Sequence, residues 1–336
     1  MNLRFLGNTG IKVSEICLGT MTFGGQGFWE NIGKVDQQGA NKLVAMALEA
    51  GVNFFDTADV YSQGISEEIL GKALGDRRKD IILATKVRGR TGPGPNDLGL
   101  SRRHIIEGCN ASLRRLGTDY IDLYQVHSFD PVTPLEETLD TLSDLIHQGK
   151  VRYIGCSNFA GWQLMKALAI STANGLERFV TLQAYYSLVG RDLELDLVPL
   201  CQDQKLGILP WSPLAGGFLT GKFRRGQKPP AGARRSASES QFIKFDENMG
   251  YAVIDELEKI AEAHNASIAQ AALNYLLRKP AVTSVIIGAR NPDQLSDNLK
   301  AGDWEMTTEE IACLDELSKP PRLYPHWFLE SGRQNR

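Results

Sequence analysis

The feature that most constrains the fold is a regular alternation of short apolar runs with amphipathic helical segments along the chain. Eight runs are rich in branched and aromatic residues and are bounded by polar residues or glycine, which is typical of strands buried on both faces. These runs cover residues 15–20, 52–57, 80–87, 121–127, 151–157, 179–185, 206–212 and 283–288. Helical patterns are predicted over residues 36–51, 101–117, 134–150, 162–174, 193–205, 249–264, 267–279 and 292–300.

This alternation predicts an α/β fold, a single (β/α)8 TIM barrel domain over residues 1–336. A doubly wound sheet would need a glycine-rich dinucleotide turn after the first strand, and GTMTFGGQG does not fit G-x-G-x-x-G. Residues 2–13 are expected to form a β-hairpin before the barrel. A long loop, about 218–247 and rich in Gly, Pro, Arg and Ser, follows strand 7, and loops of that length are often functional lids.

Composition and charge give no reason to expect several classes of partner. The chain has 37 basic and 40 acidic side chains, so its net charge of -3 gives no reason to expect nucleic acid or an anionic membrane. Five scattered cysteines indicate a reducing compartment, and no stretch approaches a membrane span, so we expect a cytoplasmic protein. The histidine and cysteine spacings predict no metal site. The oligomeric state cannot be read from the sequence.

Polar residues follow three neighbouring predicted strands. The second strand ends at Asp56 with Tyr61 in the next loop, the third ends at Lys86, and the fourth ends at His127. The carboxyl ends of barrel strands meet at one face, so these side chains should converge. A buried lysine needs a counter-ion such as Asp56, and its ammonium lowers a tyrosine pKa from about 10. A histidine can orient a carbonyl oxygen, so the set predicts a proton donor, Tyr61, for a carbonyl that receives hydride.

A set of motifs then identifies a family. They are LGTMTFGG, NFFDTADVYSQGISEEILGKAL, ATK, DLYQVH, GCSNF, LQAYYSL, PWSPLAGGFLTGK and GARNPDQLSDN. With them the chain resembles the aldo-keto reductases from the hairpin to about residue 318, in the bacterial branch related to potassium-channel β subunits. The resemblance implies a small-molecule carbonyl substrate, a nicotinamide cofactor, NADP(H), extended across the barrel mouth, and Asp56, Tyr61, Lys86 and His127 as catalytic residues.

The remaining strand ends fit this cofactor. Ser157, Asn158 and Gln183 carry groups that can pair with a carboxamide, and the Trp211 indole can stack on a nicotinamide ring. Residues 216–222 match G-x-x-x-x-G-K, but Phe223 stands where a P-loop needs Ser or Thr. The resemblance implies that further cofactor contacts come from Gly19, Thr20, Met21, Gln26, Asp56, Ser212, Pro213, Leu214, Gly216, Lys222 and Gly288.

The sequence after the last strand predicts NADPH over NADH. Arg290 precedes a helix start, NPDQ, where a guanidinium and a helix N-terminus can both bind phosphate. Gln294 and Asn298 are four apart on one helical face and can reach the adenine. The resemblance adds Asp297 there, and Arg234 and Arg235 near the phosphate.

Three functions are compared: a carbonyl reductase, a slowly turning redox-sensing or regulatory subunit, and a barrel aldolase or isomerase with a Schiff-base Lys86. His127 favours the first over the second, since channel β subunits typically carry asparagine there. The third leaves the SN, WSPL and GARNPDQLSDN motifs without a role. Specificity is expected to lie around Phe28 and Trp29, in 89–97, at Phe129, in 218–247 and in the tail 320–336. Sugar, steroid-like and quinone substrates stay open, as does the direction of the reaction.

Overall fold

The computed structural model describes residues 1–30, 32–227 and 243–333. The strands are β1 (Leu3–Phe5), β2 (Lys12–Ser14), β3 (Ile16–Gly19), β4 (Phe54–Asp56), β5 (Ile82–Val87), β6 (Ile121–Val126), β7 (Val151–Ser157), β8 (Phe179–Tyr185), β9 (Gly207–Trp211) and β10 (Val285–Ile287). The α-helices are α1 (Gln37–Glu49), α2 (Ile65–Leu74), α3 (Arg102–Leu116), α4 (Leu135–His147), α5 (Gly161–Asn174), α6 (Leu197–Gln204), α7 (Glu247–Ala263), α8 (Ile268–Leu277), α9 (Pro292–Leu299), α10 (Thr308–Leu317) and α11 (His326–Arg333).

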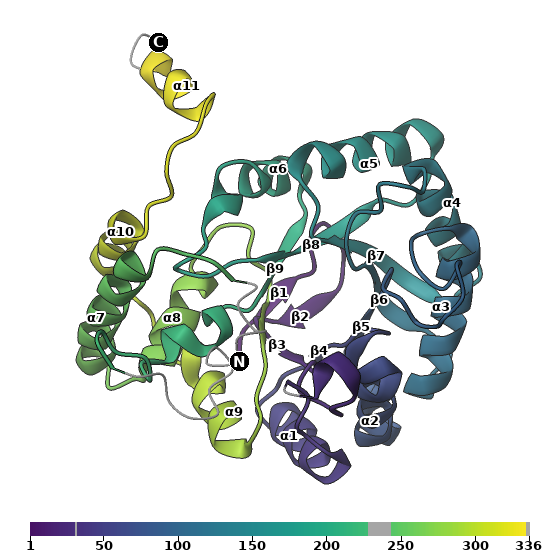
Figure 1. Ribbon diagram of the computed structural model, residues 1–336, viewed down its shortest axis with the longest axis horizontal. Coiled ribbons are helices and arrows are strands. Elements are labelled where there is room, and N and C mark those ends of the chain that lie inside the picture. The colour runs from purple at the N-terminus through teal and green to yellow at the C-terminus, as the bar shows by residue number, and fades with distance from the viewer. Residues whose placement is uncertain (31, 228–242, 334–336) are drawn as a thin grey trace.

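Eight parallel strands form the barrel in the order β10-β3-β4-β5-β6-β7-β8-β9. The bridge between Ile208 on β9 and Val282, just before β10, brings the two edges of this sheet together. Figure 1 shows the helices arranged around the strands, so each strand is buried on both faces. The predicted (β/α)8 TIM barrel is confirmed.

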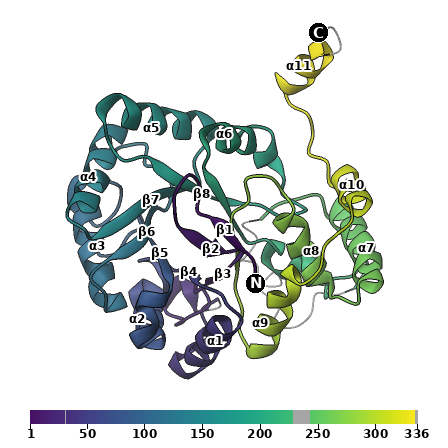
Figure 2. The ribbon, with the colours of Figure 1, turned by 180° about the vertical axis from the view of Figure 1, so that it is seen from behind.

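The N-terminal hairpin, also predicted, covers one end of the barrel. Strands β1 and β2 pair antiparallel with Leu3 opposite Ser14, and Figure 2 shows them lying across the barrel strands. Leu6 and Val13 are fully buried in a cluster with Phe54 and other residues from early positions of the barrel strands. The hairpin therefore seals the amino ends of the strands and leaves the carboxyl ends for a site.

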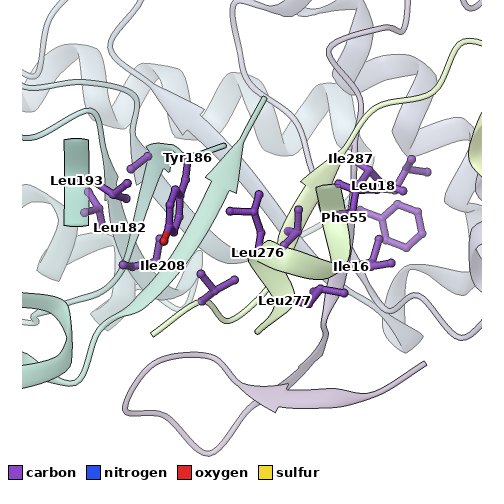
Figure 3. Packing of buried hydrophobic residues seen from close by; sticks show 14 of the residues in the cluster. Ile16, Leu18, Phe55, Leu182, Tyr186, Leu193, Ile208, Leu276, Leu277 and Ile287 are labelled. Atoms are coloured by element: carbon purple, nitrogen blue, oxygen red, sulfur yellow. The ribbon is translucent and has the colours of Figure 1, made fainter. Parts of the chain in front are cut away.

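Alternation along the strands separates an apolar layer from a polar layer. Phe54, Ala84 and Leu123 point into the barrel and pack against the hairpin residues. Because side chains alternate with period two, the next inward residues on β4, β5 and β6 are Asp56, Lys86 and Gln125. The outward-facing residues between them pack against the helices, and Figure 3 shows part of that second cluster, including Phe55, Leu182, Ile208, Leu276 and Ile287.

The predicted helices are present to within a few residues, with one clear exception. Residues 193–205 were expected to form one helix, but a 3-10 turn over Asp192–Glu194 precedes α6, which begins at Leu197. Pro199 lies in the first turn of α6, where its missing N–H is tolerated. Helices α2, α10 and α11 were not predicted. Helix α2 starts directly after Gly64, whose positive φ of 92° turns the chain from the preceding loop into the helix.

The carboxy-terminal helix α11 projects away from the barrel, as Figures 1 and 2 both show. Tyr324, Trp327 and Phe328 are more than half exposed there. Across the described ranges, no helix combines the length and the apolar character needed to cross a membrane.

Candidate active site

A cavity of about 810 Å³ opens at the carboxyl ends of the barrel strands. Tyr61 and His127 line it, together with Trp29 and Ile32 from the loop after β3. Most residues predicted to bind a cofactor also line it: Gly19, Met21, Asp56, Ser157, Asn158, Gln183, Trp211, Ser212, Pro213, Leu214, Gly216, Lys222, Gly288, Arg290, Gln294, Asp297 and Asn298. A shallower hollow of about 470 Å³ lies by the hairpin, next to Arg4 and Phe5, and contains none of these groups.

Two of the described residues predicted to contact the cofactor, Thr20 and Gln26, do not line this cavity. Thr20 is fully buried, and its hydroxyl lies 2.9 Å from Ser66 Oγ, so it joins β3 to α2 instead. Gln26 is exposed because the loop after β3 turns it towards solvent ahead of the short 3-10 turn Gly27–Trp29. Arg234, like Arg235, lies outside the described residues.

Lys86 is fully buried just beneath the cavity floor. Its Nζ donates hydrogen bonds to Asp56 Oδ1, to the Thr57 carbonyl oxygen at 2.8 Å and to Tyr61 Oη at 3.3 Å. Burial disfavours the ammonium, but Asp56 and then Tyr61 outweigh it and raise the pKa of Lys86. The lysine is therefore a fixed cation in contact with a tyrosine hydroxyl.

The second oxygen of Asp56 is held by two amides. Gln125 Nε2 donates to Asp56 Oδ2 at 3.0 Å, and Gln183 Nε2 donates to the same oxygen at 2.9 Å. The sequence interpretation missed Gln125. Its signal was a polar residue inside the apolar strand DLYQVH, two residues before His127 and hence on the same face.

A strained turn presents Tyr61. Ser62 and Gln63 have positive φ values of 49° and 57° in the turn that follows it. Ser62 Oγ donates to the Phe23 carbonyl oxygen and accepts from Gly25 N, both at 2.9 Å, which secures the turn to the loop after β3. The Tyr61 ring meets Trp29 edge-on, with 5.1 Å between ring centroids.

His127 follows β6 and faces the Tyr61 ring at 5.8 Å between centroids. The residue is half-buried and lines the cavity. Burial, followed by the positive charges of Lys86 and Arg88, lowers the pKa of His127 to about 3. The ring is therefore neutral near pH 7 and has one N–H to donate.

Asn158 connects His127 and Ser157 to Trp211. Its Nδ2 donates to the His127 carbonyl oxygen and to Ser157 Oγ, both at 2.9 Å. Its Oδ1 accepts from Trp211 Nε1 at 3.1 Å, which fixes the indole at the cavity wall. Asn158 has a φ of 55°, a left-handed conformation that asparagine tolerates better than most residues.

Two cations face the cavity near the start of α9. Burial and the neighbouring Arg290 lower the pKa of Lys222. Gln294 Oε1 accepts from the Arg290 backbone N–H at 2.9 Å. Asp297 accepts from Ser267 Oγ at 2.8 Å, so this carboxylate connects α9 to the start of α8. Cations that repel each other at a helix N-terminus fit an anionic ligand such as a phosphate.

The loops expected to set specificity are only partly at the cavity. Trp29 and Ile243 line it, as expected for the loop after β3 and the long loop after β9, the seventh predicted strand of the barrel. Phe129 instead packs on Phe159, with 5.5 Å between ring centroids. Neither residues 89–97 nor the described part of the tail is among the lining residues. No group of three or more metal-binding side chains occurs among the described residues.

Comparison with known proteins agrees with this geometry. The sequence profile described as "Aldo/keto reductase family" matches residues 15–319. The chain is 38% identical over 332 residues to the uncharacterized oxidoreductase YrpG of Bacillus subtilis, covering 96% of this chain and 97% of that protein. It is 38% identical over 326 residues to a putative voltage-gated potassium channel subunit beta of Schizosaccharomyces pombe, covering 94% and 92%. It is also 34% identical over 341 residues to the versiconal hemiacetal acetate reductase of Aspergillus parasiticus, covering 95% and 98%.

The chain therefore belongs to the aldo/keto reductase family. Members of this family are oxidoreductases that generally act on small-molecule carbonyl compounds with nicotinamide cofactors. Family membership agrees with the barrel and with a cavity at the carboxyl ends of its strands.

Proposed function

We propose that this protein catalyses the reversible, NADPH-dependent reduction of an aldehyde or ketone to an alcohol, with Tyr61 as the general acid. The observation that carries the proposal is the buried Lys86 ammonium, hydrogen-bonded both to Asp56 and to the hydroxyl of a tyrosine that lines the cavity. An acid of this kind must deliver a proton to an oxygen while a cation stabilises the anion left behind.

Each residue has a distinct role in this proposal. The bound nicotinamide supplies the hydride. Tyr61 donates its proton to the carbonyl oxygen, and Lys86 stabilises the resulting phenolate across 3.3 Å. Asp56 keeps Lys86 charged, and the neutral His127 donates its N–H to the carbonyl oxygen and orients it.

The cavity lining supports NADP(H) as the cofactor. Ser157, Asn158 and Gln183 offer hydroxyl and amide groups to a carboxamide, and Trp211 offers an aromatic face. At the start of α9, Lys222 and Arg290 suit phosphate groups. The other cavity-lining residues named above complete the proposed cradle, to which Arg234 and Arg235 would add positive charge.

A Schiff-base role for Lys86 is disfavoured by its electrostatics. Such chemistry needs a neutral, nucleophilic amine, whereas Asp56 raises the pKa of Lys86 and accepts a hydrogen bond from its ammonium. A regulatory, slowly turning subunit is the alternative within the family, and relatives named as potassium channel beta subunits motivate it. The rate of carbonyl reduction distinguishes the two functions, because a regulatory subunit would turn over slowly and an enzyme would not. Four buried, unpaired cysteines support the proposal of a cytoplasmic location.

The test is a panel of aldehydes and ketones monitored by NADPH absorbance, with wild type and Tyr61→Phe. We expect wild type to reduce members of the panel and Tyr61→Phe to be slower by about 10²- to 10⁴-fold, because general acid catalysis contributes on that order. NADPH binding should persist in the variant. Tyr120→Phe, which alters a tyrosine outside the cavity lining, is the matched control. Equal rates for wild type and Tyr61→Phe would refute the assignment.

A further inference from the structure

We propose that Gln125 is a positioning residue that fixes both Asp56 and Gln183 for the reaction; this inference rests on the proposed function. Gln125 is fully buried on the inner face of β6 and does not line the cavity. In the parallel pairing of strands its neighbours are Lys86 on β5 and Gly155 on β7. It thus lies directly below the residues that would act on substrate and cofactor.

Gln125 closes a triangle of hydrogen bonds. Its Nε2 donates to Asp56 Oδ2 at 3.0 Å, and its Oε1 accepts from Gln183 Nε2 at 3.2 Å. Gln183 Nε2 also donates to Asp56 Oδ2, at 2.9 Å. A carboxylate only accepts, so both glutamines must turn their NH₂ groups towards Asp56.

The triangle sets the orientation of Gln183. Both N–H groups of that amide are occupied, one by Asp56 and the other by Gln125. The oxygen of the amide, Oε1, is then the atom that Gln183 offers to the cavity it lines. An oxygen there accepts from the NH₂ of a nicotinamide carboxamide, which fixes the ring face turned towards the substrate.

The neighbouring backbone makes room for this arrangement. A Cβ on Gly155 would lie 3.3 Å from Gln125 Cγ and 2.4 Å from Thr181 Oγ1. A glycine at this point of β7 therefore leaves the space in which the Gln125 side chain reaches across the barrel interior. The backbone at Gly155 therefore accommodates the buried Gln125 amide in the layer of side chains beneath the cavity.

Two consequences follow from removing this amide. Asp56 loses a donor to its charged oxygen, so it becomes easier to protonate and releases Lys86 at a higher pH. Gln183 loses one of its two acceptors, so a single hydrogen bond, to Asp56 Oδ2, is left to orient its amide and the Oε1 atom that faces the cavity. A purely structural role would produce neither change.

The experiment compares Gln125→Met, Gln125→Glu and the control Leu123→Val, an apolar change two residues earlier on the same inner face. For Gln125→Met we expect kcat/KM to fall by about 10- to 100-fold, the scale of a lost hydrogen bond to a charged group, with the acid limb of its pH profile displaced upwards. Transfer of deuterium from NADPH labelled at one face of C4 should become less face-selective. Leu123→Val should lower stability and leave the pH profile and the selectivity unchanged.

Gln125→Glu gives the opposite pH signature. At pH 8 its carboxylate repels Asp56, whereas at lower pH its protonated carboxyl can donate to Asp56 as the amide does. Its activity relative to wild type should therefore rise from pH 8 to pH 5.5, while that of Gln125→Met falls. Identical pH dependence in the two variants, or the same changes in Leu123→Val, would overturn the proposal.

Cofactor binding provides a readout that does not depend on turnover. The NADPH dissociation constant, measured by tryptophan fluorescence, should rise by about 3- to 30-fold in Gln125→Met, the effect of one displaced hydrogen bond, and stay unchanged in Leu123→Val. If wild type reduces no carbonyl compound, the proposed function fails while this measurement still tests Gln125. The role of Gln125 would be refuted if Gln125→Met left the NADPH dissociation constant unchanged and, where turnover is measurable, also left the pH profile unchanged.

Discussion

The Lys86–Asp56 pair makes separate predictions for stability and activity. Lys86→Met leaves the Asp56 carboxylate in the barrel without its cation, and both side chains are at most 3% exposed. Losing one partner of such a pair costs about 3–5 kcal/mol of unfolding free energy. Two amide donors stay on Asp56 Oδ2, so we expect the lower end, about 3 kcal/mol.

The expected shift in melting temperature follows from chain length. With an unfolding entropy of about 2.1 cal/mol/K per residue, 336 residues give about 0.7 kcal/mol/K. A loss of 3 kcal/mol therefore lowers Tm by about 4 °C. The double variant Asp56→Asn with Lys86→Met should recover most of this loss, because a neutral amide oxygen still accepts from Gln125 and Gln183.

The assay combines thermal unfolding with single-turnover carbonyl reduction for wild type, both single variants and the double variant. Stability should recover in the double variant, while activity stays low in every variant that lacks the ammonium. Arg77→Met, which breaks an exposed ion pair with Asp80, is the control for removing a cation at the surface. A double variant no more stable than Lys86→Met, or an active Lys86→Met, would show that the pair does not work as described.

Three further predictions concern other parts of the cavity. NADPH should quench tryptophan fluorescence, and Trp211→Ala should lose most of the quench and about 1–3 kcal/mol of affinity, on the scale of aromatic–base stacking; an unchanged quench would contradict stacking. Arg290→Ala should weaken the binding of NADPH by about 1.5–3 kcal/mol and the binding of NADH far less, with Arg77→Ala as the control. Equal weakening of binding for both cofactors would contradict recognition of the 2′-phosphate. His127, with its pKa of about 3, should keep a neutral NMR signature from pH 8 to pH 5. Because an unfolded histidine takes up its proton near 6.5, this residue should reduce stability as pH falls from 6.5 towards 3, and protonation of folded His127 near 6.5 would contradict this.

The convergence of the polar strand ends could be predicted because it follows from alternation and parallel pairing. Once eight strands form a barrel, Asp56 and Lys86 must point inward at its carboxyl end, and the four residues 57–60 can return Tyr61 to them. The structure confirms that these three side chains are in contact. Their roles in a reaction stay predictions.

Other parts of the site depend on distances that no sequence pattern contains. Gln125 acts across the barrel, so its bonds to Asp56 and Gln183 depend on the width of the interior and on the space at Gly155. Gln26 lies outside the cavity lining because the direction of a glycine-rich loop depends on its own positive-φ turns, which no sequence pattern contains.

The strict alternation along β5 and β6 also restricts how the length of this chain can change during evolution. Inserting or deleting one residue within β5, before Lys86, would turn that ammonium out of the barrel and into the apolar layer under the helices, and the same change in β6 would expel Gln125. Such an event would remove the chemistry and destabilise the packing in one step. Insertions and deletions should therefore accumulate in the loops, and the spacing from Ala84 to Lys86 and from Leu123 to Gln125 should persist even where sequence identity between relatives is low.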